Sequence, residues 1–397
     1  MKNVYILFLL LLGPGLLFCQ EPKKPMKILV MVSCFPKINN VSVMNQITGL
    51  IDRGHEVHIF SFLPGNLVNV QKDVITYDLV NKTMYELPSS LDEYDIVIFS
   101  MGHKLFDIRK THNFKGKIVV FLRGYDITTF LTQNPHIYDH YFEICDLFMP
   151  VCEAFEKILK KEGCSPDKII VYHSSIDCSK FIFQKKKLPK KGIINIVSAG
   201  RFVEKKGLEY SIQAVAKLVK KYPNIRYTIL GGGTLRKKYR QLVEELKVKD
   251  KITIGHWLTL EDYINVLHNS HFFVLPSITT EANNQEGIAN VLKEAMAIGL
   301  LAIATEHSGN AELIQHKVSG FLVPERNSNA IVEAIEFFIN NPNKWASIQR
   351  AAKNKIHAEF NKEKENDRLE AILYALLEKQ INEKKWRESW QYELLLF

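Results

Sequence analysis

The sequence predicts an α/β protein made of two doubly wound, Rossmann-like domains whose parallel sheets face a central cleft. Short apolar runs alternate with amphipathic stretches, which is typical of strands buried on both faces and joined by crossover helices. The 397 residues are too many for one ordinary core and are enough for two domains. A charged stretch with one proline, residues 185–192 (KKKLPKKG), separates two halves that show the same alternation.

The first half is expected to alternate strands and helices. Its short apolar runs are expected to be strands, at Lys27–Ser33, Glu56–Ser61, Ile96–Ser100, Ile118–Leu122, Leu147–Val151 and Ile169–Tyr172. A helix is expected at Ser42–Arg53, because its apolar residues recur on one face at helical spacing, and Gly54 then ends it.

The second half repeats this pattern. Strands are expected at Ile193–Ser198, Arg226–Leu230, Ile252–Ile254, Phe272–Leu275 and Ala302–Ala304. Helices are expected at Leu208–Lys221, Leu235–Leu246, Glu261–Asn269, Gly287–Ile298, Ala330–Asn340 and Lys362–Lys379. Ligands of doubly wound sheets bind at the carboxyl ends of the strands, so the site is expected between the two domains.

We therefore divide the chain into five parts. They are an apolar segment (1–25), a first domain (26–184), a linker (185–192), a second domain (193–360) and a C-terminal helix with its tail (361–397). The apolar run at residues 4–18 is short for a spanning helix, which needs about 20 residues. It resembles the core of a signal peptide, and an uncleaved tether or a translation start at Met26 are the other interpretations.

The composition, with 46% hydrophobic and 24% charged residues, is that of a soluble globular protein. A net charge of +9 favours a solvated lysine-rich surface over attraction to phosphates or an anionic membrane. No nucleic-acid-binding module is recognisable, so no nucleic-acid partner is expected. The six cysteines form no CxxC pair and are expected to be reduced thiols rather than zinc ligands or disulfides.

The segment Glu286–Gly299 (EGIANVLKEAMAIG) carries the strongest signal for a site. Glu286 and Glu294 are eight residues apart, so on a helix both carboxylates approach the same face and could bind sugar hydroxyls. The N–H groups that a ligand phosphate would meet at the start of this helix are those of Gly287, Ile288, Ala289 and Asn290. Spacing alone leaves a routine solvent-facing helix as an equal alternative.

Two further segments of the second half follow predicted strands. In GRFVEKKG, Arg201 offers a planar fork and Lys206 a point charge, which together could neutralise a diphosphate leaving group. A solvated basic loop is the plainer interpretation. LGGGT at Leu230–Thr234 does not satisfy GxGxxG and argues against a nicotinamide-binding domain. The chain also lacks Asp-x-Asp, HExxH and GxSxG, so neither a bound metal nor a serine nucleophile is expected.

Three polar stretches of the first half follow predicted strands: residues 33–42 (SCFPKINNVS), His103 and residues 123–126 (RGYD). The loop after the first strand of such a sheet often contacts a ligand. A lone histidine such as His103 is more often structural than catalytic.

At this point the motifs resemble a known family. GRFVEKKG, LPS at Leu275–Ser277, EGIANVLKEAMAIG, HSGNAELI and SGFLVPE follow the order and spacing of the retaining glycosyltransferase family 4. The stretch FPKINNVSVMNQITGLIDRGHEVHIFS is most similar to the colanic-acid and amylovoran-type exopolysaccharide glycosyltransferases. The resemblance covers roughly Met26–Phe360.

The resemblance implies a GT-B fold, with the acceptor on the first domain, the donor in the second and a C-terminal helix that crosses back. It implies a retaining, metal-independent hexosyl transfer from a nucleotide sugar, with no cofactor and with UDP more common than GDP. Arg201 and Lys206 would grip the diphosphate, while Glu286 would contact the donor sugar and Glu294 the ribose. The acceptor would be a glycan or a polyprenyl-linked sugar. The enzyme would work in the cytoplasm at the inner membrane face, with the apolar segment as a tether.

Two departures from the family pattern concern the reacting centre. Many members carry HGxD where this chain has RGYD, so Arg123 replaces a histidine and cannot act as a base. His103 is expected to lie nearby and to take part of that role. The usual GxP after the first glutamate reads Gly287–Ile288–Ala289 here. A catalytically impaired sugar-binding relative and a nucleotide-sugar epimerase are therefore the alternatives.

Overall fold

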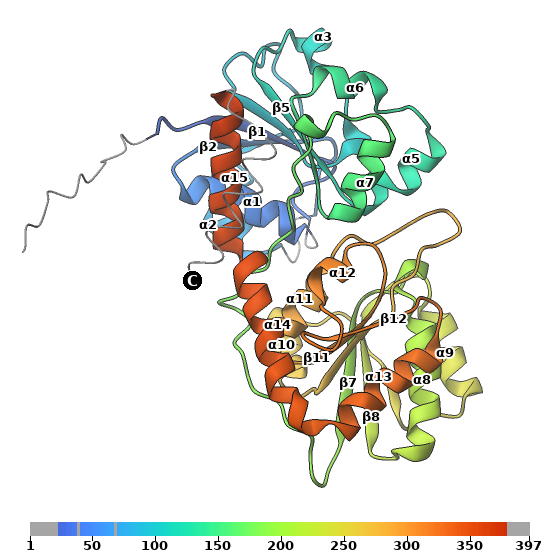
Figure 1. Cartoon of the computed structure of the whole chain (residues 1–397). Coiled ribbons are helices and arrows are strands. Elements are labelled where there is room, and N and C mark those ends of the chain that lie inside the picture. Colours follow the sequence, from blue (N-terminus) through green and yellow to red (C-terminus); the bar gives the residue numbers. More distant parts are fainter. Residues whose placement is uncertain (1–22, 38–39, 67–69, 379–397) are drawn as a thin grey trace, which may run out of the picture.

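The computed structural model describes residues 23–37, 40–66 and 70–378, which form two α/β domains (Figure 1). The apolar run at 4–18 and the tail after residue 378 lie outside the described residues, so the expectations for them stay predictions. The five described cysteines, Cys34, Cys145, Cys152, Cys164 and Cys178, are unbridged, as expected.

The first domain contains a six-stranded parallel sheet in the order β3-β2-β1-β4-β5-β6. Its strands are β1 (Lys27–Val32), β2 (Glu56–Ser61), β3 (Thr83–Met84), β4 (Ile96–Phe99), β5 (Lys117–Leu122) and β6 (Leu147–Pro150). Its helices are α1 (Val41–Asp52), α2 (Lys72–Thr76), α3 (Ile108–His112), α4 (Gly124–Ile127), α5 (Thr129–Gln133), α6 (Asp139–Ile144) and α7 (Glu153–Lys161), with 3-10 turns η1 (Gly102–Lys104) and η2 (Pro166–Lys168).

The second domain repeats this architecture with the order β12-β11-β10-β7-β8-β9, again all parallel. Its strands are β7 (Ile194–Arg201), β8 (Ile225–Gly232), β9 (Ile252–Ile254), β10 (Phe272–Leu275), β11 (Leu301–Thr305) and β12 (Phe321–Val323). Its helices are α8 (Leu208–Lys221), α9 (Arg236–Glu245), α10 (Leu260–His268), α11 (Asn290–Ile298), α12 (Asn310–Leu313), α13 (Ser328–Asn340) and α14 (Trp345–Glu359), with 3-10 turns η3 (Glu204–Lys206) and η4 (Pro342–Lys344).

Each sheet is buried on both faces, which explains why the strands read as continuous apolar runs. In β4, Val97 and Phe99 belong to one apolar cluster, whereas Ile96 and Ile98 belong to the cluster on the opposite face. The first of these clusters continues into the second domain and includes Ile288. The two domains are therefore joined by shared apolar packing and not only by the chain.

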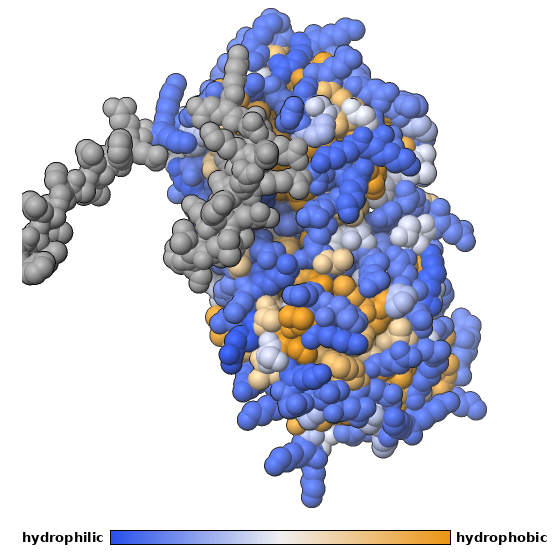
Figure 2. Space-filling view, viewed as in Figure 1, coloured by the Kyte–Doolittle hydropathy of each residue, from blue (hydrophilic) through white to orange (hydrophobic). Residues whose placement is uncertain are grey.

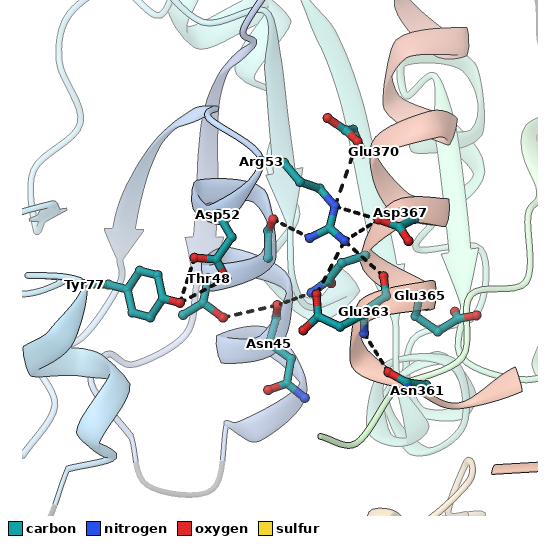
Figure 3. Close-up of polar contacts among 12 residues, drawn as sticks. Asn45, Thr48, Asp52, Arg53, Tyr77, Asn361, Glu363, Glu365, Asp367 and Glu370 are labelled. Carbon is teal, nitrogen blue, oxygen red and sulfur yellow. Dashed lines mark hydrogen bonds and ion pairs between the residues drawn. The ribbon is translucent and has the colours of Figure 1, made fainter. Parts of the chain in front are cut away.

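The last helix, α15 (Lys362–Leu377), returns to the first domain, as expected, and lies beside α1 (Figure 1). A Cβ on Gly49 of α1 would lie 1.9 Å from the Asn366 side chain, so glycine is needed for this close contact. Arg53 ends α1, donates to Gly49 O at 2.9 Å and to Glu363 O at 3.1 Å, and forms an ion pair with Asp367 (Figure 3). These bonds fasten the C-terminal helix to the first domain.

Two expected elements differ in the structure. Residues 169–172 form no regular strand and contribute a single bridge between Ile169 and Phe148. The expected linker at 185–192 contacts the second domain through buried Lys186, which donates its backbone N–H to Gln349 at 3.0 Å and its ammonium to the carbonyl of His268. Lys185, Lys187, Lys190, Lys191 and Gly192 are exposed. The helix expected to begin at Gly287 begins only at Asn290.

The surface that can be seen in Figure 2 is mostly hydrophilic, with hydrophobic residues gathered over part of the second domain. Within the described ranges, no helix combines the length and apolar character that a membrane crossing requires.

Candidate active site

Glu286 is the centre of a compact charged cluster in the second domain. Lys205 Nζ lies 2.9 Å from Oε1 of Glu286, and Lys206 Nζ contacts Oε2. The three side chains are 8–14% exposed. Burial alone would raise the pKa of the Glu286 carboxyl, but the charges of Lys206 and Lys205 hold its pKa well below the usual range. Glu286 is therefore a carboxylate at neutral pH, as an acceptor for sugar hydroxyls requires.

Two glycines shape the loop that carries these lysines after β7. Gly207 follows η3 in the left-handed region at φ +57°, where a Cβ would lie 2.0 Å from Pro276 O. Gly200 has φ +151°, and Lys206 folds back over it, with Cε 3.3 Å from its Cβ position. Arg201 ends β7 with an exposed side chain, opposite Gly232 of β8. Arg201 and Lys206, which are predicted to bind the diphosphate, thus lie at the carboxyl end of β7 and in the loop that follows it.

The glycine-rich segment LGGGT supports the same strand end. Its first two glycines complete β8, and Gly231 pairs in register with Gly200. A Cβ on Gly231 would lie 1.9 Å from Gly200 O, so only glycine lets β8 run this close to β7. The segment therefore lets β8 pair closely with β7 next to Arg201, and its first two glycines belong to the strand and not to a separate turn.

A histidine and a second carboxylate fix the backbone of Glu286. The Glu286 N–H donates to Nε2 of His307 at 2.9 Å, so the ring proton resides on Nδ1, which lies 2.6 Å from Oε1 of Glu325. Burial lowers the pKa of His307, which favours this neutral form. Glu325 also accepts the N–H of Thr279 at 2.8 Å.

These supporting residues were not predicted. His307 and Glu325 fall within HSGNAELI and SGFLVPE, and Lys205 falls within GRFVEKKG, but no role was assigned to any of them. A usable signal existed for His307, because it follows β11 at the carboxyl end of a strand.

Glu294 lies on α11, and Tyr263 of α10 donates to its Oε2 at 2.9 Å. Burial raises the pKa of Glu294 to about 7. The expectation that Glu286 and Glu294 share one helix face is wrong, because Glu286 lies four residues before the helix begins. Its ion pairs with two lysines and its bond to His307 hold it in the preceding loop.

Of the four residues expected to bind phosphate at the helix start, three precede α11 and one begins it. Gly287, Ile288 and Ala289 precede α11, and the latter two are buried, 6% and 9% exposed. A Cβ on Gly287 would lie 2.7 Å from Val151 Cγ2, so this glycine lets the loop approach the first domain. Asn290 opens the helix, and its Nδ2 lies 3.3 Å from Ser42 Oγ of α1. Their role toward phosphate stays a prediction.

On the first domain, His103 and Arg123 meet at Asp126, as the expectation of a nearby His103 requires. Asp126 is 2% exposed and accepts the backbone N–H groups of Arg123 at 2.9 Å and of His103 at 3.2 Å. Its Oδ1 also contacts Nδ1 of the His103 ring. The Arg123 side chain turns inward, where Nε donates to Ser100 O at 3.1 Å and Nη2 to Gln46 at 3.2 Å.

The first-domain loop with Arg123 and the second-domain loop with Glu286 touch at Gly124. A Cβ on Gly124 would lie 2.5 Å from Gln285 O and 3.6 Å from Lys205 Nζ. Asn283 donates to Thr132 Oγ1 at 2.9 Å across the same contact. The loop that carries Arg123 and Asp126 therefore abuts the loop that carries Glu286.

A cavity of about 530 Å³ lies elsewhere, lined by residues such as Arg109, Lys117 and Lys168. It opens near the amino ends of β5 and β6, opposite the edge where parallel sheets bind ligands. Its cations already have partners, since Arg109 and Lys117 bind Asp146 and Lys168 donates to three carbonyl oxygens. We do not assign a function to this cavity.

Comparisons with known proteins bear on the family and the fold of this chain. Residues 179–355 match the family model described as glycosyl transferases group 1. The amylovoran biosynthesis glycosyltransferase AmsK of Erwinia amylovora is 27% identical over 392 residues, which cover 85% of this chain and 96% of AmsK. WcaL of Escherichia coli (strain K12), named for colanic acid biosynthesis, is 26% identical over 398 residues, covering 86% and 98%.

Two solved structures share the fold, each with a TM-score of 0.70. A glycosyltransferase from Rickettsia africae ESF-5 is 18% identical and covers 89% of this chain and 99% of its own. Anabaena Alr3699/HepE in complex with UDP is 16% identical, covering 88% and 100%. The two six-stranded parallel sheets and these neighbours confirm the expected GT-B fold.

Proposed function

We propose that this chain, a glycosyltransferase whose residues 179–355 form a group 1 domain, moves a hexose-type sugar from a nucleotide diphosphate to a glycan or lipid-linked acceptor. We place this transfer in the synthesis of a surface polysaccharide, because AmsK and WcaL are named for amylovoran and colanic acid biosynthesis. A UDP-sugar is the favoured donor, and the Anabaena neighbour solved with UDP supports this choice.

The observation that carries the proposal is the charged Glu286 cluster, whose Lys205 and Lys206 lie in the loop that follows Arg201 at the end of β7. In the proposal, Arg201 and Lys206 bind the diphosphate, and Glu286 accepts hydrogen bonds from the donor sugar. Glu294 binds a ribose hydroxyl. The first N–H groups of α11 add positive potential for the phosphates.

The proposed reaction uses this charge to stabilise the leaving group. The bond between sugar C1 and the phosphate oxygen breaks, and its electron pair stays on that oxygen. Arg201 and Lys206 neutralise the negative charge that develops there. The acceptor hydroxyl gives its proton to the leaving phosphate, and its oxygen bonds to C1 on the face that the phosphate leaves, which retains the anomeric configuration. No metal is needed in this proposal, because these cations supply the charge.

We further propose that the enzyme works at the cytoplasmic face of a membrane, with the apolar N-terminal segment as a tether. Nucleotide sugars are made in the cytosol, and a net charge of +9 is compatible with contact with anionic lipid headgroups.

The proposal is tested with purified full-length protein, donors such as UDP-glucose, UDP-galactose, UDP-N-acetylglucosamine and GDP-mannose, and a panel of p-nitrophenyl glycosides as acceptors. Arg201→Ala and Lys206→Ala are each expected to abolish transfer and leave the folded state intact. Lys221→Ala is the matched control, because Lys221 is an exposed lysine of the same domain that pairs with Glu336.

Other outcomes would identify the alternatives. Full transfer by both variants would contradict the proposed site. Tight donor binding by the wild type without turnover would indicate a sugar-binding relative. A C2 epimer formed from the UDP-sugar alone would indicate an epimerase.

A further inference from the structure

Glu312, which lies in α12 of the second domain, reaches across to the first domain. Its Oε1 accepts the backbone N–H groups of Glu153 at 2.9 Å and of Ala154 at 3.4 Å, the first two residues of α7. Its Oε2 lies 3.1 Å from Nε2 of His173, and these two side chains are only 15% and 19% exposed. Figure 1 shows α7 and α12 on the facing sides of the two domains. One carboxylate of the second domain thus contacts the first domain at two places.

The amino end of α7 depends on this contact, because the residue before the helix supplies no cap. That residue is Cys152, whose side chain makes no capping hydrogen bond. Serine, threonine, aspartate and asparagine are the residues that cap helices well, and cysteine is not among them. The free N–H groups at the start of a helix carry partial positive charge, so a carboxylate there is stabilising. The second domain therefore supplies the cap that the first domain lacks.

Close packing surrounds Glu312 on both sides. A Cβ on Gly309, the residue before α12, would lie 2.8 Å from Cys152 Cβ, and Ser308 Oγ lies 3.8 Å from the Cys152 sulfur. The centre of the His173 ring lies 4.9 Å from that of Phe360, the residue at which the chain passes from α14 towards α15. The Glu312 contact is therefore part of a packed interface between the domains and not an isolated surface bond.

The segment that carries Glu312 also holds the proposed donor cluster. His307 accepts the N–H of Glu286 and stands five residues before Glu312. Between them, Asn310 donates its backbone N–H to His307 O at 3.0 Å and its side-chain amide to Thr305 O at 3.0 Å. Asn310 is 1% exposed, so it is fixed by its surroundings. The segment therefore holds Glu286 at one end and the first domain at the other.

We propose that Glu312 is a positioning residue that sets the orientation of the first domain relative to the Glu286 cluster. It contacts neither substrate and acts through α7 and His173. Transfer needs the acceptor oxygen and C1 of the donor in close alignment, and a misplacement of about 1 Å can lower the rate by about 10²-fold. The proposed donor groups all lie in the second domain, so donor binding does not need this orientation. The effect on turnover rests on the proposed glycosyl transfer.

The test compares full-length Glu312→Ala with the wild type in the transfer assay described above. We expect kcat to fall by about 10²-fold, while the Kd for UDP, measured by calorimetry, stays unchanged. Small-angle X-ray scattering should give a larger radius of gyration for the variant, because the domains lose the carboxylate that joins them. Glu312→Gln keeps an oxygen that can accept from α7 and should retain more activity than Glu312→Ala.

A double variant separates positioning from the stability of α7. Cys152→Ser places a good capping residue before the helix, so Glu312→Ala/Cys152→Ser should melt at a higher temperature than Glu312→Ala. It does not restore the bond between the domains, so its kcat should stay low. Recovery of kcat together with the melting temperature would overturn the inference, because a stable α7 would then be sufficient for transfer.

Asp107→Ala is the matched control. The Asp107 carboxylate also accepts a helix N–H, that of Lys110 at 2.9 Å, and also lies 2.9 Å from Nε2 of a histidine, His140, but all three residues belong to the first domain. This variant should lose stability through the same kind of contact and keep the wild-type kcat and radius of gyration.

The outcomes separate the two proposals. Wild-type kcat and radius of gyration in folded Glu312→Ala would overturn the inference alone. No turnover by the wild type with any donor would overturn the proposed glycosyl transfer, and an unchanged radius of gyration in Glu312→Ala would then overturn the role of Glu312 as well.

Discussion

The proposed donor side and the proposed acceptor side of this protein are held together by different means. On the donor side, Glu286 is surrounded by two lysines and its backbone is fixed by His307, so charge is concentrated at one carboxylate. On the proposed acceptor side, one buried carboxylate, Asp126, contacts the His103 ring and accepts the backbone N–H groups of His103 and Arg123, beside exposed Tyr125. The first arrangement suits a highly charged diphosphate, and the second suits an uncharged sugar hydroxyl.

This difference predicts different responses to the loss of one carboxylate. Glu286→Gln leaves Lys205 and Lys206 buried without their counter-charge, which typically costs about 3–5 kcal/mol of unfolding free energy. Transfer should fall by about 10²–10³-fold or more. Urea unfolding and initial transfer rates measure the two effects. A variant as stable and as active as the wild type would show that the lysine cluster is not the functional centre.

The next largest effect should come from His307, which acts on Glu286 only through its backbone. His307→Ala leaves the Glu286 N–H without its acceptor, an unsatisfied buried group worth about 1–3 kcal/mol. Displacement of the Glu286 carboxylate should lower kcat by up to about 10²-fold. His268→Ala, at the end of α10, is the control. If kcat and the donor KM both stay unchanged, the backbone of Glu286 does not need His307.

A third effect concerns the dependence of stability on pH and does not involve transfer. Burial raises the pKa of Glu294 from its ordinary 4.5 to about 7, so the folded state holds this proton more tightly than the unfolded chain. The resulting stability is fully present below about pH 4.5 and is lost as the pH rises through about 7. Glu294→Gln should remove this loss.

Unfolding free energies at pH 5, 6 and 7 measure the effect. The series ends at pH 7 because burial also lowers the pKa of neighbouring Lys293 to about 7. That shift makes stability rise with pH between about 7 and the ordinary lysine value of 10.5, which opposes the Glu294 dependence. Parallel curves for Glu294→Gln and the wild type would show that Glu294 is not the group that titrates.

The sequence predicted the bounds of helices and strands closely where the local pattern of apolar residues determines them. β2 and α8 have the predicted bounds, since their apolar residues alternate or recur clearly against polar neighbours. Two short strands, β3 and β12, were not predicted, because two or three residues cannot establish a period. The start of α11 was placed three residues too early, because Gly287 lies against Val151 of the first domain and not in the helix, a contact that local sequence preference does not predict.

The same limit applies to the site. Arg201, Lys206 and Glu286 lie in dense motifs that follow predicted strands, and the structure places Lys206 directly against Glu286. The contact of His103 with Asp126 joins residues 23 positions apart on two different strand ends. His103 and Asp126 lie close together because β4 pairs with β5 in parallel. No periodicity in the sequence predicts that pairing.

The most direct test of the central claim is a thermal-shift comparison of nucleotide-sugar binding by the wild type, Lys206→Ala and His103→Gln. A ligand that binds only the folded state raises the melting temperature by mass action. We predict that at least one nucleotide sugar stabilises the wild type and His103→Gln equally and fails to stabilise Lys206→Ala. Equal stabilisation of Lys206→Ala would contradict a donor site at the Glu286 cluster.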